Sequence, residues 1–283
     1  MKKLYLHIGF PKTGTTFLQR NVFTESKKSG YKYISKDYGN HKYFNVFLLK
    51  NRLKLLELFN NSNNVLVSDE TYIFQKIQTS VENNFFTDYN ELYDLLKFLK
   101  EKKISVKLYF ITRLQSDILC SLYVQLLQGH LNKNCSFPDF YNLFKPSSSL
   151  HNLLLYDKLK SKILKNLDEK DLFYYSYEKF NQDKFNFVCQ ILDHMELPKD
   201  FVKNVDLTEK VNNRSLKSSS KVTHPLTLRF ILYRIKRNIF GNKISFGVGV
   251  KLKPILDSIK FKNSKVVTFT EQDKSIIFNW YKK

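Results

Sequence analysis

Cysteine, proline and glycine are scarce in this chain of 283 residues, which has 3, 6 and 8 of them. The cysteines, Cys120, Cys135 and Cys189, lie far apart and form no Cys-x-x-Cys pair. The sequence therefore lacks the patterns of a zinc site and of a disulfide framework, which favours a reduced compartment. No window approaches the roughly 20 apolar residues of a membrane helix. The apolar run after Lys3 is too short for a signal peptide, so we expect a cytoplasmic protein.

Acidic residues are also few, 26 against 47 basic ones, which gives a formal net charge of +21. Such a surface favours anionic partners, namely nucleotides, acidic glycans, anionic lipid headgroups or nucleic acid, without choosing among them. Hydrophobic residues make up 42% of the chain and aromatic residues 15%. This composition argues against a disordered chain. The length allows one sizeable core, and we expect residues 1–283 to form a single domain.

Strand and helix patterns alternate along most of the chain. Strands are predicted at 4–8, 64–68, 105–113 and 171–176, and helices at 15–24, 42–59, 90–102, 116–128, 151–166 and 182–195. This order predicts parallel β-α-β units, and hence a three-layer α/β/α fold around a mainly parallel sheet. Ligands of such sheets bind beyond the carboxyl ends of the strands. The stretch 130–150 contains two prolines and a serine run, and is predicted to be an irregular loop or lid.

The C-terminal part, residues 210–283, is predicted to be a basic, mainly helical extension of the same domain. It has no acidic residue from Lys210 to Leu256. A basic helix with one apolar stripe is predicted to begin near Pro225, and Thr270 is expected to cap the last helix. The basic helix would pack on the protein core or lie on an anionic membrane, so peripheral contact with the inner membrane surface stays open. The stretch 245–251 is expected to be a turn between strands.

Residues 7–19, HIGFPKTGTTFLQ, have the layout of a phosphate-binding loop. They follow a short apolar strand and lead into a helix, whose first N–H groups have no partners inside the helix. The nucleoside-triphosphate form, G-x-x-x-x-G-K-[ST], has a lysine directly after its second glycine. Here Gly9 and Gly14 have the right separation, but Thr15 stands at the lysine position and the lysine is Lys12.

This loop resembles the 5′-phosphosulfate-binding loop of sulfotransferases that use 3′-phosphoadenosine 5′-phosphosulfate (PAPS). The family form is [FYL]-P-K-[ST]-G-[ST]-[ST] after the first strand. It is matched here by Phe10, Pro11, Lys12, Thr13, Gly14, Thr15 and Thr16. The His-Ile-Gly lead-in is most similar to that of the bacterial, carbohydrate-modifying members.

A second match lies in YFITRLQSDILCSLY. Arg113 ends the predicted strand 105–113, and Ser121 comes eight residues later on the next helix. Family members have an Arg and a Ser at these places, both of which contact the 3′-phosphate of the donor. Eight residues span a tight turn and just over one helical turn, so both side chains can converge on one phosphate. Weaker matches are DLFYYSYEKF, QILDHMELP and KVNNRSL, the last of which makes Arg214 a further candidate for the 3′-phosphate.

The resemblance implies transfer of a sulfuryl group from PAPS to a hydroxyl of a polysaccharide or glycolipid. The product of the donor would be adenosine 3′,5′-bisphosphate (PAP), and no metal would be needed. Residues 13–16 can offer backbone N–H groups and hydroxyls to the 5′-phosphate. Lys12 can stabilise the negative charge that grows on the bridging oxygen as the S–O bond breaks. A lysine after the glycine would suit β- and γ-phosphates, which PAPS lacks.

The expected general base is Glu70, which comes just after the carboxyl end of strand 64–68. Glycan sulfotransferases that resemble this chain often use a Glu, whereas small-molecule members use a His in a K-T-H-L-P stretch that this sequence lacks. Asp69 and His7 are alternatives, and His7 is expected to be structural because it alternates with apolar neighbours on a central strand. Several family members have a Lys after the comparable Glu, where this chain has Thr71.

Two other functional classes stay open. A P-loop nucleotide kinase or NTPase would need a lysine at position 15 and an acidic strand end for Mg²⁺, which Asp69 can mimic. A non-catalytic basic module that binds anionic glycan or nucleic acid fits the charge, yet the sequence contains no recognition motif. The preferred prediction is therefore a sulfotransferase with a carbohydrate or glycolipid acceptor and no nucleic-acid partner.

Overall fold

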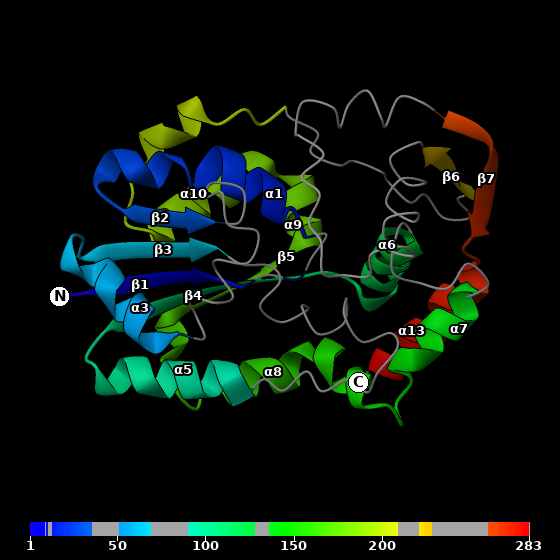
Figure 1. Ribbon diagram of the computed structural model, residues 1–283, viewed down its shortest axis with the longest axis horizontal. Coiled ribbons are helices and arrows are strands. Elements are labelled where there is room, and N and C mark those ends of the chain that lie inside the picture. The colour runs from blue at the N-terminus through cyan, green and yellow to red at the C-terminus, as the bar shows by residue number, and fades with distance from the viewer. Residues whose placement is uncertain are drawn as a thin grey trace, which may run out of the picture. The chain divides into compact units, whose positions relative to one another are not determined.

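The computed structural model describes residues 1–8, 10, 13–35, 51–68, 90–127, 136–208, 221–227 and 260–282 (Figure 1). These residues belong to two compact units. The first comprises Met1–Leu114 and Ser149–Arg214, and the second comprises Gln115–Ser148 and Ser215–Lys283. The single domain expected from the sequence stays a prediction.

The first unit is built on a five-stranded sheet with the order β2-β3-β1-β4-β5, in which every neighbouring pair is parallel. The strands are β1 (Lys3–His7), β2 (Lys32–Ser35), β3 (Asn64–Ser68), β4 (Ser105–Thr112) and β5 (Leu172–Ser176). The predicted α/β class with a parallel sheet is confirmed, as are the four predicted strands. The sequence did not reveal β2, because its four residues are too few for a distinct pattern.

β1 lies at the centre of the sheet, so both of its faces are covered. Its side chains alternate between the two faces, Tyr5 and His7 on one and Leu4 and Leu6 on the other. All four side chains are fully buried. A strand that is buried on both faces has a nearly continuous apolar sequence, which is why β1 could be recognised from the sequence.

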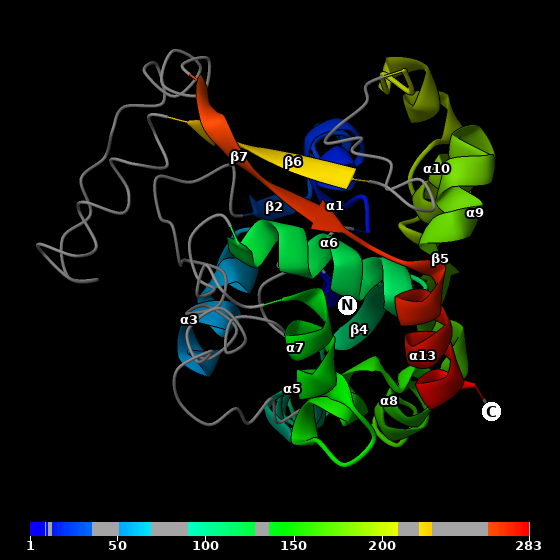
Figure 2. The same ribbon diagram turned by 90° about the vertical axis from the view of Figure 1, so that its right-hand side faces the viewer.

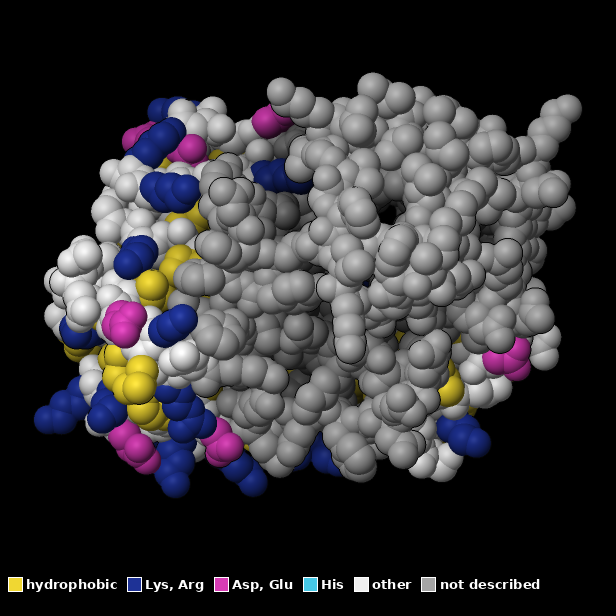
Figure 3. Space-filling model, viewed as in Figure 1, with side chains coloured by type: hydrophobic (Ala, Val, Ile, Leu, Met, Phe, Trp, Pro, Cys, Tyr) yellow, Lys and Arg dark blue, Asp and Glu magenta, His cyan; other side chains and the backbone are white. Residues whose placement is uncertain are grey.

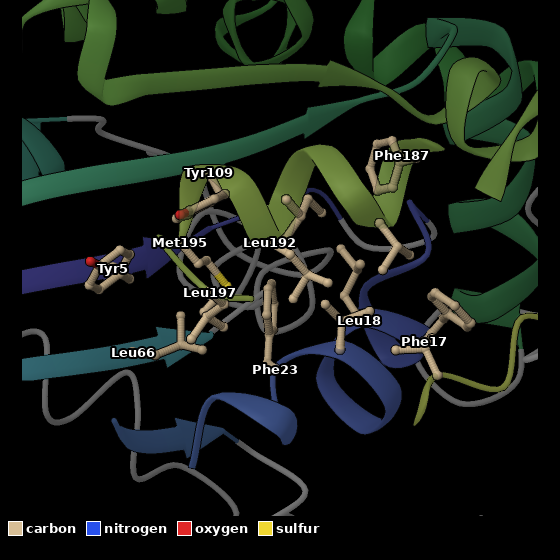
Figure 4. Close-up of a cluster of buried hydrophobic side chains, with 14 of the residues drawn as sticks. Tyr5, Phe17, Leu18, Phe23, Leu66, Tyr109, Phe187, Leu192, Met195 and Leu197 are labelled. Atoms are coloured by element: carbon tan, nitrogen blue, oxygen red, sulfur yellow. The ribbon is translucent and has the colours of Figure 1, made fainter. Parts of the chain in front are cut away.

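Helices α1 (Thr15–Phe17), η1 (Leu18–Val22) and α10 (Lys184–His194) cover the face of the sheet that carries Tyr5 (Figure 1). Figure 4 shows the apolar cluster between these helices and the sheet. Its members include Phe17, Leu18 and Phe23 after the loop, Phe187 and Leu192 on α10, and Tyr5, Leu66 and Tyr109 on the strands. Burial of one such Leu or Phe side chain contributes roughly 1.5–3 kcal/mol, so this cluster holds the helix after the loop firmly on the sheet.

Helices α5 (Asn90–Glu101) and α8 (Tyr156–Ile163) lie together on the other face (Figure 1). The leucines of α5 at positions 92, 95, 96 and 99 are buried, as their spacing predicts, and α5 packs on β4. α8 is shorter than the predicted helix 151–166, because Ser149–Leu154 forms a 3-10 helix instead. Of the predicted helix 42–59, the described part contains α3 (Arg52–Glu57) and the 3-10 turn η3 (Leu58–Asn60).

A short helix that was not predicted, α9 (Tyr177–Gln182), begins directly after β5. Its N-cap is Ser176, whose side chain accepts a hydrogen bond from the N–H of Glu178. Asp183 ends this helix and caps α10, since its side chain accepts a hydrogen bond from the N–H of Asn186. The region after β5 therefore contains two helices where one, 182–195, was expected.

The second unit contains α6 (Gln115–Leu127), α7 (Phe137–Tyr141) and α13 (Glu271–Tyr281), with an antiparallel ribbon of β6 (Lys221–Thr227) and β7 (Lys260–Thr268) (Figure 2). Aromatic rings join α7 and α13, since the ring centres of Tyr141 and Trp280 are 5.6 Å apart. The cap predicted at Thr270 is confirmed, because its hydroxyl accepts the N–H of Asp273 at 3.0 Å. No helix in the described ranges is long and apolar enough to cross a bilayer.

Two expectations for this unit are wrong. The irregular loop predicted at 130–150 contains α7, because Ser136 and Asp139 form a capping box that starts a helix. A helix does not begin near Pro225, which lies within β6 at an irregularity between His224 and Leu226. A strand tolerates proline at such a place, since proline has no N–H for the ladder. The predicted turn at 245–251 lies outside the described residues.

Candidate functional site

The loop after β1 depends on Gly14 in two ways. Its φ of 79° is in the left-handed region, which glycine adopts without steric cost. A Cβ at this position would lie 3.2 Å from Cε1 of Phe180 and 3.3 Å from Cε2 of Tyr177, both on α9. A side chain at residue 14 would therefore press on α9, and glycine allows this close approach without a shift of the two rings.

Two threonine hydroxyls hold the loop from within. Thr13 and Thr15 both donate to the carbonyl oxygen of Phe10, at 2.5 and 3.4 Å, and both side chains are buried. The carbonyl of Gly14 accepts the N–H of Leu18 at 3.1 Å, which begins the helix. Because the first N–H groups of a helix lack partners inside it, the loop can present the N–H groups at the start of α1 to an anion.

Arg113 follows β4, the strand that lies next to β1 in the sheet. Its guanidinium carbon is 4.9 Å from the ring centre of Tyr177, within the range of a cation–π interaction. Its carbonyl oxygen accepts the hydroxyl of Tyr156 at 2.8 Å. The N–H of Leu114 donates to Oε1 of Glu178 at 3.1 Å. Arg113 is thus held through its side chain and through the peptide group that follows it, whose C=O and N–H are both hydrogen-bonded.

The loop and Arg113 meet at the same ring, because Tyr177 is close to Gly14 and lies under the guanidinium of Arg113. The order of the strands explains this meeting. From β1 the chain continues to β2 on one side, and from β4 it continues to β5 on the other side. Where neighbouring strands diverge in this way, an open α/β sheet has a crevice at its carboxyl edge, and ligands bind there.

His7 lies in a buried polar cluster beside the loop. Its Nδ1 is 2.7 Å from Oγ of Ser68, and the amide of Gln19 donates to the same Oγ at 3.0 Å. Burial lowers the pKa of His7 to about 3. An imidazole with so low a pKa has little tendency to accept a proton, and its complete burial keeps an acceptor hydroxyl away. Both features support the structural role expected from the sequence.

The structure brings several predicted site residues together in the first unit, namely Thr13, Gly14, Thr15, Thr16 and Arg113. Ser121 lies on α6 in the second unit, so its convergence with Arg113 on one phosphate stays a prediction. The remaining predicted residues, Pro11, Lys12, Glu70, its alternative Asp69, and Arg214, lie outside the described residues. Their roles also stay predictions.

Sequence reasoning did not assign roles to Tyr156, Tyr177 and Glu178, the residues that hold Arg113. The Tyr-Glu pair was visible in the sequence as a weak family match. Its contact with the residue after Arg113 was not, because Leu114 and Glu178 are 64 positions apart. Within the described ranges, no group of three or more His, Cys, Asp and Glu side chains is placed to hold a metal ion.

No protein-family model matches the sequence, and no curated protein matches it. Solved structures are similar in fold. A sulfotransferase from Alicyclobacillus acidocaldarius is 14% identical, with a TM-score of 0.50 over 75% of this chain and 87% of that chain. For mouse sulfotransferase SULT7A1 complexed with PAP, the TM-score is 0.45 at 15% identity, over 76% of this chain and 67% of that chain. For retinol dehydratase in complex with androsterone and inactive cofactor PAP, the TM-score is 0.47 at 14% identity, over 100% of this chain and 80% of that chain. The α/β fold of this chain is thus that of a solved sulfotransferase structure.

Proposed function

We propose that this protein transfers a sulfuryl group from PAPS to a hydroxyl of a carbohydrate acceptor, either a polysaccharide or a glycolipid. The observation that carries the proposal is the meeting of the glycine loop and Arg113 at Tyr177, beside the switch point of a parallel sheet. The sequence match of the loop supports the donor. The acceptor class rests on the His-Ile-Gly lead-in and on a Glu as the base.

The described residues fit a donor that carries anionic groups at two places on its ribose. The helix start after Gly14 offers N–H groups for the 5′-phosphate, and the absence of a Cβ on Gly14 lets the loop lie close to Tyr177 on α9. Arg113 offers a planar guanidinium for the 3′-phosphate. When bound, PAPS would supply the activated sulfuryl group that is transferred.

Two residues outside the described ranges complete the proposed mechanism. Lys12 neutralises the negative charge that develops on the 5′-phosphate oxygen as the sulfuryl group leaves. Glu70 removes the proton of the acceptor hydroxyl, a contribution of roughly 10²–10⁴-fold for a general base. Both assignments rest on the position of these residues in the sequence, directly before Thr13 and just after β3.

The alternative of a P-loop kinase or NTPase is weakened by the environment of Thr15. This residue stands where the nucleoside-triphosphate loop has its lysine. In the structure its side chain is buried, with its hydroxyl directed at the carbonyl of Phe10. The position therefore serves to shape the loop, and a phosphate-binding lysine is not found there.

Isothermal titration with PAP in the absence of Mg²⁺ tests the proposed function. We expect binding to the wild type, and a loss of at least about tenfold in affinity for Arg113→Ala, since a charged hydrogen-bonded pair is removed. Binding of ATP with Mg²⁺ but not of PAP would support the kinase instead. Binding of neither nucleotide would favour the non-catalytic module. Incubation with radiolabelled PAPS and a panel of glycans would then identify the acceptor.

The basic C-terminal region remains a proposed contact with an anionic membrane surface. The proposal rests on the sequence of this region, which has no acidic residue from Lys210 to Leu256. On the face shown in Figure 3, Lys and Arg side chains (dark blue) are spread over the described residues, with Asp and Glu side chains (magenta) among them. Sedimentation with vesicles of anionic or neutral lipid tests this contact. Equal sedimentation with both kinds of vesicle would contradict an electrostatic attachment.

A further inference from the structure

We propose that Glu178 is a positioning residue that acts through Arg113 and determines the preference for a nucleotide with a 3′-phosphate. The inference rests on the proposed function, since it concerns the same donor site. Glu178 is half-buried and lies in the first turn of α9. Its carboxylate connects this turn to the end of β4, as the following contacts show.

The two carboxylate oxygens of Glu178 have different partners. Oε1 accepts the N–H of Leu114 at 3.1 Å, and Oε2 accepts the hydroxyl of Ser176. The N–H of Glu178 in turn donates to Oγ of Ser176 at 3.1 Å. The second oxygen therefore fixes the carboxylate at the N-terminus of α9, where a negative charge is favourable, and leaves the first oxygen aimed at the residue after Arg113.

The end of β4 is held at three successive residues. The hydroxyl of Thr112 donates to the carbonyl of Tyr175 at 3.1 Å. The carbonyl of Arg113 accepts the hydroxyl of Tyr156, and the N–H of Leu114 reaches Glu178. Of these three hydrogen bonds, only the one to Glu178 involves a charged side chain, and such bonds are roughly twice as strong as neutral ones. Glu178 and Tyr156 therefore fix the peptide after Arg113 from its two sides, and Glu178 is the partner that carries a charge.

The same turn of α9 also contacts the loop. Tyr177 stands directly before Glu178, supports the guanidinium of Arg113 and lies against Gly14. One turn of α9 thus contacts both the helix start that would receive a 5′-phosphate and the arginine that would receive a 3′-phosphate. A nucleotide with both groups can use both contacts at this separation, whereas a 5′-monophosphate uses only the first.

The test compares two nucleotides by isothermal titration, PAP and adenosine 5′-monophosphate, in four proteins. These are the wild type, Glu178→Ala, Glu178→Gln and the control Glu169→Ala. For Glu178→Ala we expect about a tenfold weaker affinity for PAP and less than about a twofold change for the monophosphate. Glu178→Gln keeps one acceptor oxygen and should lie between this variant and the wild type.

Glu169 is a matched control because it is an exposed carboxylate before β5, in an ion pair with Lys160 at 3.3 Å. We expect Glu169→Ala to keep the wild-type preference for PAP. An equal loss of affinity for both nucleotides in Glu178→Ala would overturn the inference, since it would indicate general damage to the site. An unchanged preference would overturn it as well.

The experiment also distinguishes a variant that does not fold from a failure of the proposed function. If Glu178→Ala does not fold, Glu178→Gln decides, and a wild-type preference in that variant would contradict the inference. If the wild type itself does not bind PAP, the proposed function fails, and with it the donor site on which the inference depends. If the wild type binds PAP and the variants keep its preference, only the role of Glu178 is refuted.

Discussion

His7 and Ser68 are joined by a hydrogen bond of 2.7 Å between Nδ1 and Oγ, where β1 and β3 end side by side. Gln19, on the helix after the loop, donates to the same Oγ. One serine hydroxyl therefore links the strand before the loop, the helix after it and the strand that leads to the predicted base. We expect this cluster to hold the two ends of the loop in a fixed position relative to the end of β3.

The burial of His7 makes the stability of the protein depend on pH. The folded state keeps the pKa of His7 at about 3, whereas the value is 6.5 for the free side chain. As the pH falls below about 6.5, the unfolded state binds a proton that the folded state does not bind. The free energy of unfolding should therefore decrease as the pH decreases below about 6.5, by up to about 1.4 kcal/mol per pH unit for this group.

Urea unfolding of the wild type and of His7→Asn at several pH values between about 6.5 and 4.5 measures this dependence. The carboxylates that titrate in the same range are common to both proteins, so the difference between the two slopes reports His7. We expect a flatter slope for the variant, because asparagine binds no proton in this range. Identical slopes would show that the buried imidazole is not the cause.

Gly14→Ala should affect both folding and donor binding. Alanine at a φ of 79° is strained, and its Cβ would press on Tyr177 and Phe180. We expect the free energy of unfolding to fall by about 1–3 kcal/mol and the affinity for PAP to fall with it. Gly30→Ala is the matched control, because Gly30 has a φ of 77° and a Cβ there would meet no heavy atom within 4 Å. If both variants lose the same free energy of unfolding, the loss comes from the positive φ alone, and the close approach of the loop to α9 adds no cost.

Lys12→Ala should separate binding from transfer. The lysine is proposed to act on charge that develops only during the reaction, so its loss should lower kcat by about 10²–10³-fold with little effect on PAP affinity. Single-turnover transfer with radiolabelled PAPS, together with titration of PAP, measures both quantities. A variant that binds PAP and keeps full transfer activity would refute the role of Lys12 at the leaving group.

Glu70→Gln and Asp69→Asn should distinguish the two candidate carboxylate bases. Removal of the true base should lower kcat by about 10²–10⁴-fold, and the other substitution should have a small effect. In the wild type, the rate should also fall at acidic pH, as the base becomes protonated. Wild-type activity in both variants would show that the base is another residue of the chain.

The parts of the fold that could be predicted are those with local sequence signals. β3 has the predicted bounds, because a short apolar run between polar residues is typical of a buried strand. The loop was recognised because its residues are consecutive. α7 is hard to recognise, because two prolines and a serine run nearby are typical of a loop, although Ser136 and Asp139 have the spacing of a capping box. The contacts around Arg113 could not be predicted, because they join residues 43 and 64 positions apart.

The internal hydrogen bonds of the loop have a consequence for turnover. Thr13 and Thr15 fix the shape of the turn through Phe10, so little ordering is needed when a nucleotide enters. The groups that this turn and Arg113 would recognise, the two ribose phosphates, are common to donor and spent nucleotide. For the proposed sulfotransferase we therefore expect the spent nucleotide to dissociate slowly and to inhibit transfer competitively against the donor, which steady-state kinetics with added PAP would measure.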